Sequence, residues 1–463
     1  MIAMKKIALS TLLMGAVALF YSNTALAGIP IEHWTQASGV QVYLVQSQVI
    51  PMVDMQVDFD AGSRRDPADQ AGLASVTASM TSKGVLASAG TGAGATEPAL
   101  DENALSEAWA DLGASFGAGA SGDRMSFSLR SLTYPDLLIK ATQLAARQLG
   151  EPAFPPAIWL RERETLNAAI REANTRPATL AARAFNSAVY GQHPYGFQMT
   201  EATLARISVA DMKAMYSALI LPCRAKVTMV GAVNRSEADG LVTQLFSRLS
   251  ATTAANAPTA CPALPAVAEV APLDKPAEKR IAFNSAQAHV LIGQPGFKRD
   301  DPDYFALTVG NYILGGGGFV SRLTNEVREK RGLSYSVYSY FAPGLHAGAF
   351  TLGLQTRPDQ VNQALQVSRD VVVQFVAVGP TEAELKAAKD NLIGGFALRI
   401  DSNRKLLDNV ANIAWNKLPL DYLDTWTQQV EKVSAADIKA AFARKLQPDK
   451  MVTVVLGGAA AGN

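Results

Sequence analysis

The chain has 463 residues, 48% of them hydrophobic, and its 42 basic side chains nearly balance 41 acidic ones. This length predicts two or three domains with full hydrophobic cores, and a near-neutral chain without a basic stripe argues against nucleic-acid binding. The two cysteines, Cys223 and Cys261, are too few for a disulfide scaffold or for a thiolate zinc cluster.

The first 27 residues have the features of a secretory signal peptide. Lys5 and Lys6 precede an apolar run at residues 7–20, and Ala25 and Ala27 form an A-x-A cleavage site. The run is too short to span a membrane, and no later apolar run is long enough. We therefore expect cleavage after Ala27 and export of the mature chain to the periplasm or the medium.

A tract rich in alanine, proline and threonine divides the remaining chain into halves of about equal length. It covers residues 251–276 and predicts an extended connector between an N-terminal domain at 28–250 and a C-terminal domain at 277–463. Alternating apolar residues predict strands near 40–44, 53–59 and 125–129. Helical periodicity predicts helices at 136–148, 158–173, 178–190, 304–314, 359–378, 382–400 and 403–415.

The two halves look like copies of one unit. Ser208 stands three residues before Asp211, and Ser434 stands three residues before Asp437; each pair marks a helix start that precedes a β-rich closing strand. A duplication is the economical explanation. Because strands and helices occur in separate runs, we predict an α+β fold with two homologous halves, each a mainly antiparallel sheet with helices packed on one face.

The densest motif of the second half begins with four glycines at residues 315–318. Val320, Leu323 and Val327 follow at helical spacing, so we predict a helix with one apolar stripe. Gly332 is expected to end this helix, and the alternating residues after it predict a strand from residue 333 onward.

Arg328 in the last turn of this helix and Tyr335 at the start of the strand are then separated by one tight corner. Both side chains are hydrogen-bond donors, and together they could bind a carbonyl oxygen and a developing oxyanion. The alternative is structural: Arg328 pairs with a carboxylate near its helix, and Tyr335 packs in a sheet.

The segment from Ala61 to Gly84 resembles the active-site helix region of the pitrilysin/insulinase family of zinc peptidases, the inverzincins. The match rests on A-G-S-R-R-D-P at residues 61–67, on G-L-A at 72–74, and on Met80, Lys83 and Gly84. Where the family has H-x-x-E-H, this chain has Ser75, Ala78 and Ser79. In the family the histidines bind zinc and the glutamate is the base for the zinc-bound water; serines are poor zinc ligands, and Ala78 cannot accept a proton.

The family's remaining ligand is a glutamate eight residues before a proline, and counting back from Pro177 puts Ala169 in that position. Glu162, Glu164 and Glu172 lie nearby but off the required position. The four histidines are scattered, and we expect surface or turn roles for them; they are His33, His193, His289 and His346. The resemblance therefore implies that this chain binds no metal and has no cofactor of its own.

The resemblance covers nearly the whole mature chain and also bears on Arg328 and Tyr335. Active members have an arginine and a tyrosine with the same spacing in the second half, which reach the scissile peptide bond. A chain that lacks the zinc site but keeps this pair resembles the non-catalytic subunit of a heterodimeric peptidase, half of a clam shell. It implies a homologous zinc-bearing partner with H-x-x-E-H and short unfolded peptides as substrates.

Two other functions remain open from the sequence. The chain could be a non-enzymatic scaffold or peptide-binding assembly protein with the same fold, or an independent metallopeptidase with a relocated site. Two structural questions also stay open. Cys223 and Cys261 could bridge the connector to the first half or remain free thiols, and the glycine-rich loop at residues 87–96 could be a flexible linker or could line the chamber. This loop lacks the Lys-Ser/Thr of a phosphate-binding loop.

Overall fold

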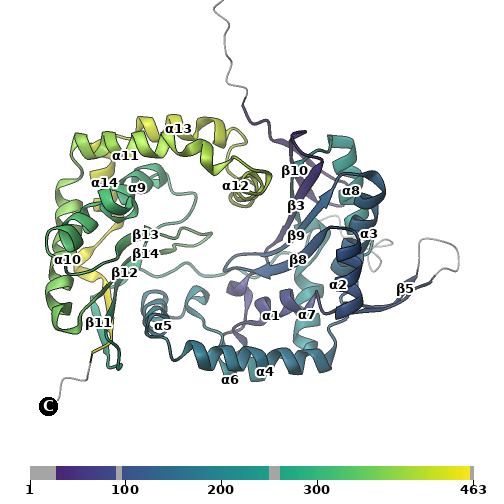
Figure 1. Cartoon of the computed structure of the whole chain (residues 1–463), viewed down its shortest axis with the longest axis horizontal. Coiled ribbons are helices and arrows are strands. Elements are labelled where there is room, and N and C mark those ends of the chain that lie inside the picture. The colour runs from purple at the N-terminus through teal and green to yellow at the C-terminus, as the bar shows by residue number, and fades with distance from the viewer. Residues whose placement is uncertain (1–27, 90–95, 250–260, 459–463) are drawn as a thin grey trace, which may run out of the picture.

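The computed structural model describes residues 28–89, 96–249 and 261–458, so the predicted signal peptide lies outside the described residues. Two β-sheets with helices face each other across the middle of the molecule (Figure 1). In the described ranges no helix has the length and apolar character needed to cross a membrane.

The first half is built on a six-stranded sheet, in which β2 and β10 are parallel and all other neighbours are antiparallel. Its strands, in spatial order, are β1 (Glu32–Thr35), β2 (Gln41–Gln46), β10 (Lys226–Gly231), β3 (Met52–Phe59), β9 (Met125–Leu132) and β8 (Ser115–Ala120). Two short ladders pair β4 (Gly84–Val85) with β7 (Leu100–Asp101) and β5 (Ser88–Ala89) with β6 (Thr96–Glu97). Its helices are α1 (Leu73–Met80), α2 (Glu102–Asp111), α3 (Pro135–Gly150), α4 (Pro156–Ala173), α5 (Pro177–Tyr190), α6 (Glu201–Arg206), α7 (Val209–Leu219) and α8 (Arg235–Phe246).

The second half repeats this plan with a five-stranded sheet, in which only β11 and β15 are parallel. Its strands, in spatial order, are β11 (Ala277–Ile281), β15 (Val452–Leu456), β12 (Ala288–Pro295), β14 (Ala349–Thr356) and β13 (Val337–Phe341). Its helices are α9 (Tyr304–Asn311), α10 (Val361–Val378), α11 (Glu382–Gly394), α12 (Asn403–Asn416), α13 (Tyr422–Lys432) and α14 (Ala435–Lys445).

The two sheets have equivalent strand orders, as a duplication requires. The series β2-β10-β3-β9-β8 matches β11-β15-β12-β14-β13, with a parallel pair at one end and an edge hairpin at the other. The Ser208 and Ser434 side chains cap α7 and α14 by accepting from the backbone N–H of Asp211 and Asp437, and these helices precede the central strands β10 and β15. The predicted α+β class is confirmed.

Two predicted helices are too long. The prediction for residues 304–314 is wrong at its end, because α9 stops at Asn311 and a π-helical segment, Tyr312–Gly316, follows. The prediction for residues 382–400 also fails after Gly394, where a short 3-10 turn replaces the α-helix. Adjacent glycines at both places lower the helix propensity, which explains both early ends.

Each half sends one helix to the inner face of the other half's sheet (Figure 1). Helix α5 packs on β12 and β15, where Phe185 and Val189 belong to one buried cluster with Val454. Gly293 on β12 is needed there, since a Cβ at this position would lie 2.7 Å from Phe185 Cζ. In return α12 packs on β10 and β3, with Leu407 and other apolar residues against β2 and β10. We predicted helices on only one face of each sheet, and α5 and α12 add a helix from the other half to the second face.

Lys226 ties α12 to the first sheet and makes this contact sensitive to pH. Its Nζ donates to the carbonyl oxygens of Ala414 at 2.7 Å and Trp415 at 3.2 Å, and burial lowers its pKa from 10.5 to about 8. Below pH 8 the lysine is charged in the folded and unfolded chains, so burying that charge lowers stability. Between about pH 8 and 10.5 only the folded chain has lost the proton, so stability rises with pH.

We therefore expect the stability of the wild type, relative to Lys226→Met, to increase from pH 8 to pH 10. Urea denaturation of both proteins at pH 7, 8, 9 and 10 measures this difference. A constant difference across that range would contradict the proposed cost of burying the Lys226 charge.

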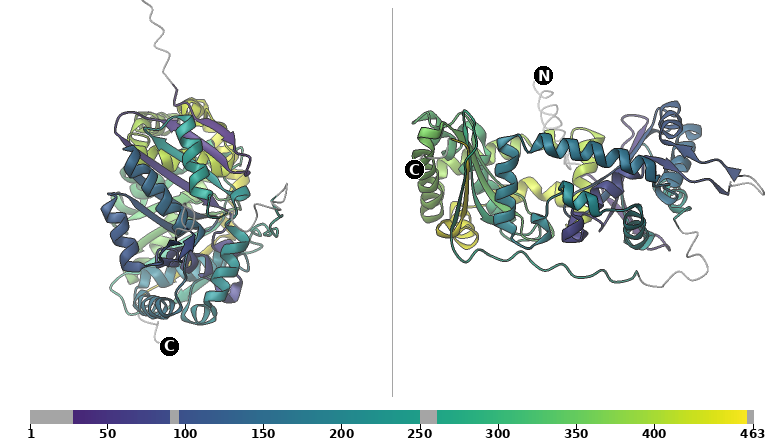
Figure 2. Two further views of the ribbon diagram at one scale, coloured as in Figure 1. Left: turned by 90° about the vertical axis from the view of Figure 1, so that its right-hand side faces the viewer. Right: turned by 90° about the horizontal axis from the view of Figure 1, so that it is seen from below.

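The connector contacts both halves. Cys223 and Cys261 form a disulfide, which answers the open question and fixes the connector to the first half. From Cys261 the chain runs extended along the outside of the molecule to β11 (Figure 2). Arg224 donates to the Pro262 carbonyl at 2.6 Å, and Glu269 accepts from the backbone N–H of Ala347 in the second half at 2.9 Å.

Candidate functional site

The motif around residues 61–74 holds helix α1 in place. Both carboxylate oxygens of Asp66 accept backbone hydrogen bonds at the helix start, from Gly72 at 2.8 Å and Ala74 at 2.9 Å. Burial raises the pKa of Asp66 to about 6, although these backbone hydrogen bonds act in the opposite direction and lower it. Gly72 adopts a φ of 107°, which favours glycine. These residues therefore have a structural role that does not depend on zinc.

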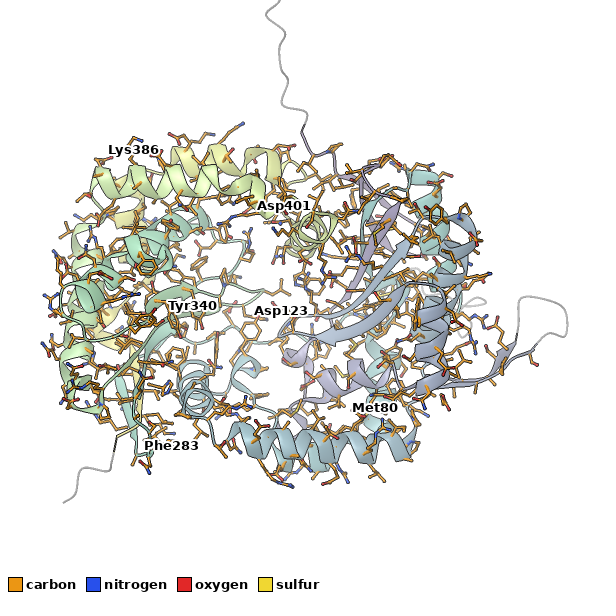
Figure 3. The ribbon with its side chains drawn as sticks, in the orientation of Figure 1. Met80, Asp123, Phe283, Tyr340, Lys386 and Asp401 are labelled. Carbon is orange, nitrogen blue, oxygen red and sulfur yellow. A yellow bond between two sulfur atoms is a disulfide. The ribbon has the colours of Figure 1, made fainter. Side chains whose placement is uncertain are left out.

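The same motif joins α1 to the turn between β8 and β9. Buried Arg64 pairs with Asp60 at 2.5 Å and with Asp123 at 3.1 Å. Gly62 lies against this turn so closely that a Cβ would be 2.4 Å from the backbone nitrogen of Arg124. Asp123 also accepts from the backbone N–H of Leu345 in the second half at 3.0 Å. Figure 3 shows Asp123 between the two halves.

Helix α1 presents the two altered zinc-ligand positions on its accessible side. Most of the helix is buried, but Ser75 is half-buried and Ser79, one turn later, is exposed; Ala78 is buried. The Ser79 hydroxyl donates to the carbonyl of Val76 at 3.1 Å. Two hydroxyls and a methyl group do not provide the nitrogen ligands and the base that a catalytic zinc requires, so these residues do not fit the metal.

The third altered position, Ala169, is exposed on α4. Two of the acids near it are paired with cations: Glu162 lies 3.3 Å from Lys83 and 3.0 Å from Arg161, and Glu172 pairs with Arg176. In the described part of the chain, no three His, Cys, Asp or Glu side chains are grouped to hold a metal ion.

The four histidines have varied surroundings. His33 stacks on Tyr43, and His289 lies in β12. His193 starts the predicted turn and is only 7% exposed, so of the two expected roles it has that of a turn residue. Its ring lies 5.1 Å from the ring of His346, which belongs to the second half and packs against it.

The glycine run of the second half allows close packing and a turn. A Cβ at Gly315 would lie 2.4 Å from Ser339 Oγ, and Gly318 has a φ of 59°. The helix that follows is largely π-helical, over Thr324–Glu329, and it buries Leu323 and Val327 completely. Val320 is 70% exposed, so its predicted place on the buried stripe is wrong. Such π-helical segments are frequent at functional sites.

Arg328 and Tyr335 lie side by side. The guanidinium carbon of Arg328 is 4.4 Å from the centre of the Tyr335 ring and 4.7 Å from the ring of Phe319. Tyr335 is 80% exposed and precedes β13, which starts at Val337, so the predicted strand begins later than expected. Arg328 also lies 3.2 Å from the Glu329 carboxylate, as the structural alternative proposed, but Tyr335 does not pack in a sheet.

Phe319 was missed by the sequence analysis. It is 71% exposed and completes an aromatic–guanidinium–aromatic stack. The feature that could have identified Phe319 is its position, a large apolar residue directly after a run of four glycines. The glycines have no side chains that could cover the ring. The exposed Phe319 and Tyr335 rings around a cation are typical of a ligand-binding surface.

A second concave surface lies on the inner face of the first sheet and was also missed. It is a cavity of about 670 Å³ lined by β8, by polar residues of β3 and β9, and by one residue of α12; the lining residues are Gln56, residues 115–121, Arg124, Ser126, Ser128 and Arg404. Strand β8 is the edge of its sheet, so one side of it is unpaired. A Cβ at Gly117 or Gly119 would meet no atom within 4 Å, so the space above β8 is open.

The described arms of the glycine-rich loop at residues 87–96 form the β5–β6 hairpin, which points away from the second half (Figure 1). Residues 90–95 lie outside the described ranges. The hairpin arms themselves therefore do not line the space between the halves.

Comparison with known proteins identifies the family. A family model described as Peptidase M16 inactive domain matches residues 206–392. The crystal structure of a peptidase M16 inactive domain from Pseudomonas fluorescens has a TM-score of 0.84 and 33% identity, covering 94% of this chain and 99% of that one.

Two curated relatives match over shorter segments. The uncharacterized zinc protease SCO5738 of Streptomyces coelicolor is 35% identical over 162 residues, which are 35% of each chain. The non-peptidase homolog YmxG of Helicobacter pylori is 35% identical over 170 residues, which are 36% of this chain and 38% of that protein. The matched segments thus span little more than a third of either relative.

The two-sheet fold and the altered helix α1 define a metallopeptidase-like protein without zinc-ligand side chains at the family positions. The chain belongs to the peptidase M16 family, and the resemblance to pitrilysin and insulinase is confirmed. With Ser75, Ala78, Ser79 and Ala169 in place of the ligands and the base, it is an inactive member of that family.

Proposed function

We propose that this chain is the exported, zinc-free subunit of a heterodimeric M16 peptidase that cleaves short unfolded peptides. The homologous partner subunit would bear the zinc site with H-x-x-E-H. One observation carries the proposal: the chain lacks every zinc ligand, yet it presents Arg328 and Tyr335 as an accessible, preformed pair of donors.

In this assignment the partner activates the attacking water, and the present chain holds the substrate. Arg328 and Tyr335 orient the scissile carbonyl and stabilise the oxyanion that develops on it. The stacked rings of Phe319 and Tyr335 fix the guanidinium between them, so little of its freedom is lost when substrate binds. A pair organised before binding is what stabilisation of a transition state requires.

The cavity beside β8 supports a peptide as the ligand. The unpaired edge of β8 offers backbone N–H and C=O groups to an extended segment, which can join the sheet as an additional strand. The glycines of β8 leave room for the side chains of that segment. A short unfolded peptide adopts this extended conformation without disrupting a fold of its own, which agrees with short unfolded substrates.

The test compares the purified chain with the same chain mixed with a zinc-bearing M16 subunit from the same genome. The substrate is a quenched fluorescent peptide library. We expect no hydrolysis by this chain alone and hydrolysis that a chelator abolishes in the mixture. Chelator-sensitive hydrolysis by the chain alone, at stoichiometric zinc, would overturn the proposal.

A peptide-binding protein without an enzymatic role is the second candidate. It is favoured by the cavity and the edge strand, which the chain forms from its own residues without a partner. In that case the purified chain binds peptides, but adding it to a zinc-bearing M16 subunit leaves the rate of hydrolysis unchanged.

A further inference from the structure

We infer that the cavity on the inner face of the first sheet selects an acidic side chain of the bound peptide, which the guanidinium group of Arg404 binds and which the positive charge of Arg124 in the same lining favours. This inference rests on the proposed peptide-binding function and names the chemical class of the peptide. It concerns a surface on the first half, apart from the Arg328–Tyr335 pair.

The first argument is the open part of the sheet. Helix α12 packs mainly over β2, β10 and β3, and the cavity lies open over β9 and β8 on the same face. The free surface carries small or neutral groups: Gly117 and Gly119 of β8, and Ser126 and Ser128 opposite them on β9. A strand added to β8 would direct every second side chain over this surface, at intervals of about 7 Å. The cavity can therefore accept a side chain of medium size.

The second argument is the sign of the charge. Among the described residues that line the cavity, Arg124 and Arg404 are the charged ones. Asp54 and Asp58 lie on the same sheet face, but they are only 2% and 1% exposed. Asp54 pairs with Arg130 at 3.0 Å, and Asp58 pairs with Arg124 at 3.1 Å and accepts from Ser126. A carboxylate that enters the cavity therefore meets guanidinium groups. Asp54 and Asp58 are buried and paired with arginines, so they repel it little.

The third argument is the unused binding capacity of the two arginines. Arg124 donates to Asp58 and, at 3.3 Å, to Asn412, and a guanidinium has five N–H groups. Arg404 has a side chain that is 53% exposed, and its Nε lies 3.5 Å from Asp408, which is longer than a good charged hydrogen bond. A carboxylate can bind the Arg404 guanidinium through both oxygens and replace the weak contact with Asp408.

The experiment measures binding of labelled extended octapeptides to the purified full chain by fluorescence anisotropy. The peptides differ at one central position, which is Glu, Gln or Lys. At low salt we expect the Glu peptide to bind about tenfold more tightly than the Gln peptide, and the Lys peptide to bind most weakly. High salt should reduce the difference, because it screens charges that water can reach.

Variants of α12 test the assigned residue. Arg404→Gln should remove the preference for Glu, and Arg404→Glu should shift it towards the Lys peptide. Lys405→Gln is the matched control, because Lys405 is the next residue on the helix and bonds to Asp401 and to the Leu398 carbonyl instead. Thermal melts of each variant establish that it is folded.

The outcomes separate the two proposals. Equal affinity for the Glu and Gln peptides, with peptide binding intact, would overturn the acidic preference alone. An unchanged preference in Arg404→Gln would overturn the assignment to Arg404. Failure of every peptide to bind would overturn peptide binding by this chain and the preference with it.

Discussion

Replacing Arg328 with alanine in the heterodimer that we propose is expected to lower kcat for peptide hydrolysis by about 10²–10³-fold, the usual effect of removing one oxyanion donor. The guanidinium is held between two rings and is reached by solvent, so its removal takes away a donor and leaves no buried gap. The zinc content of the partner and the melting temperature of this chain should stay unchanged. Steady-state kinetics with one fluorogenic peptide measures the effect.

Arg331→Ala is the matched control for Arg328→Ala. Arg331 follows in the same segment, is also partly exposed, and pairs with Glu326 at 2.7 Å instead of stacking on the rings. Tyr335→Phe keeps the stacked ring but removes the hydroxyl, so a loss of kcat there isolates the phenol as a donor. If Arg328→Ala and Arg331→Ala have equal rates, the role of Arg328 in catalysis is refuted.

Helices α5 and α12 each pack on the sheet of the other half, and truncating a buried side chain on either helix is expected to destabilise the whole chain. Leu407→Ala on α12 should lower the free energy of unfolding by about 2–5 kcal/mol, and Phe185→Ala on α5 by about 3–5 kcal/mol, because both side chains are almost completely buried. Each helix covers the sheet of the other half, so both variants should shift one common unfolding transition. Chemical denaturation followed by circular dichroism and by tryptophan fluorescence measures it.

Leu398→Ala serves as the control for these variants, since Leu398 is 68% exposed and belongs to the same half as α12. It should change the free energy of unfolding by less than about 0.5 kcal/mol. Two separate transitions, with Leu407→Ala shifting only one of them, would show that the halves unfold independently and would contradict the expected coupling.

Local features of the fold could be predicted from the sequence because their causes are local. The capping residues Ser208 and Ser434 mark helix starts that the structure confirms. The placement of α5 and α12 could not be predicted, because it depends on contacts between residues about two hundred positions apart, such as Lys226 and Ala414. Helical periodicity shows that a helix has an apolar face but does not show which sheet covers it.

The candidate site could be predicted only where a motif marks it. The residues around Asp66 and the Arg328–Tyr335 pair stand in recognisable patterns, and the structure brings that pair together. The cavity beside β8 has no such pattern. Gly117 and Gly119 contribute to it only because no other atoms fill the space above them, and this is visible only in three dimensions. The participation of Arg404 depends on the docking of α12, so the sequence around it gives no indication of a binding role.

The exchange of α5 and α12 also has a consequence for the ancestry of the chain. If the ancestral gene encoded a single unit, that unit would have left the inner face of its sheet bare and its outlying helix without a partner. Two identical copies related by a two-fold axis would satisfy both needs at once, since each would lend its helix to the other. The present polypeptide then corresponds to such a homodimer joined end to end, and the two unlike binding surfaces arose after the joining removed the requirement that both units be the same.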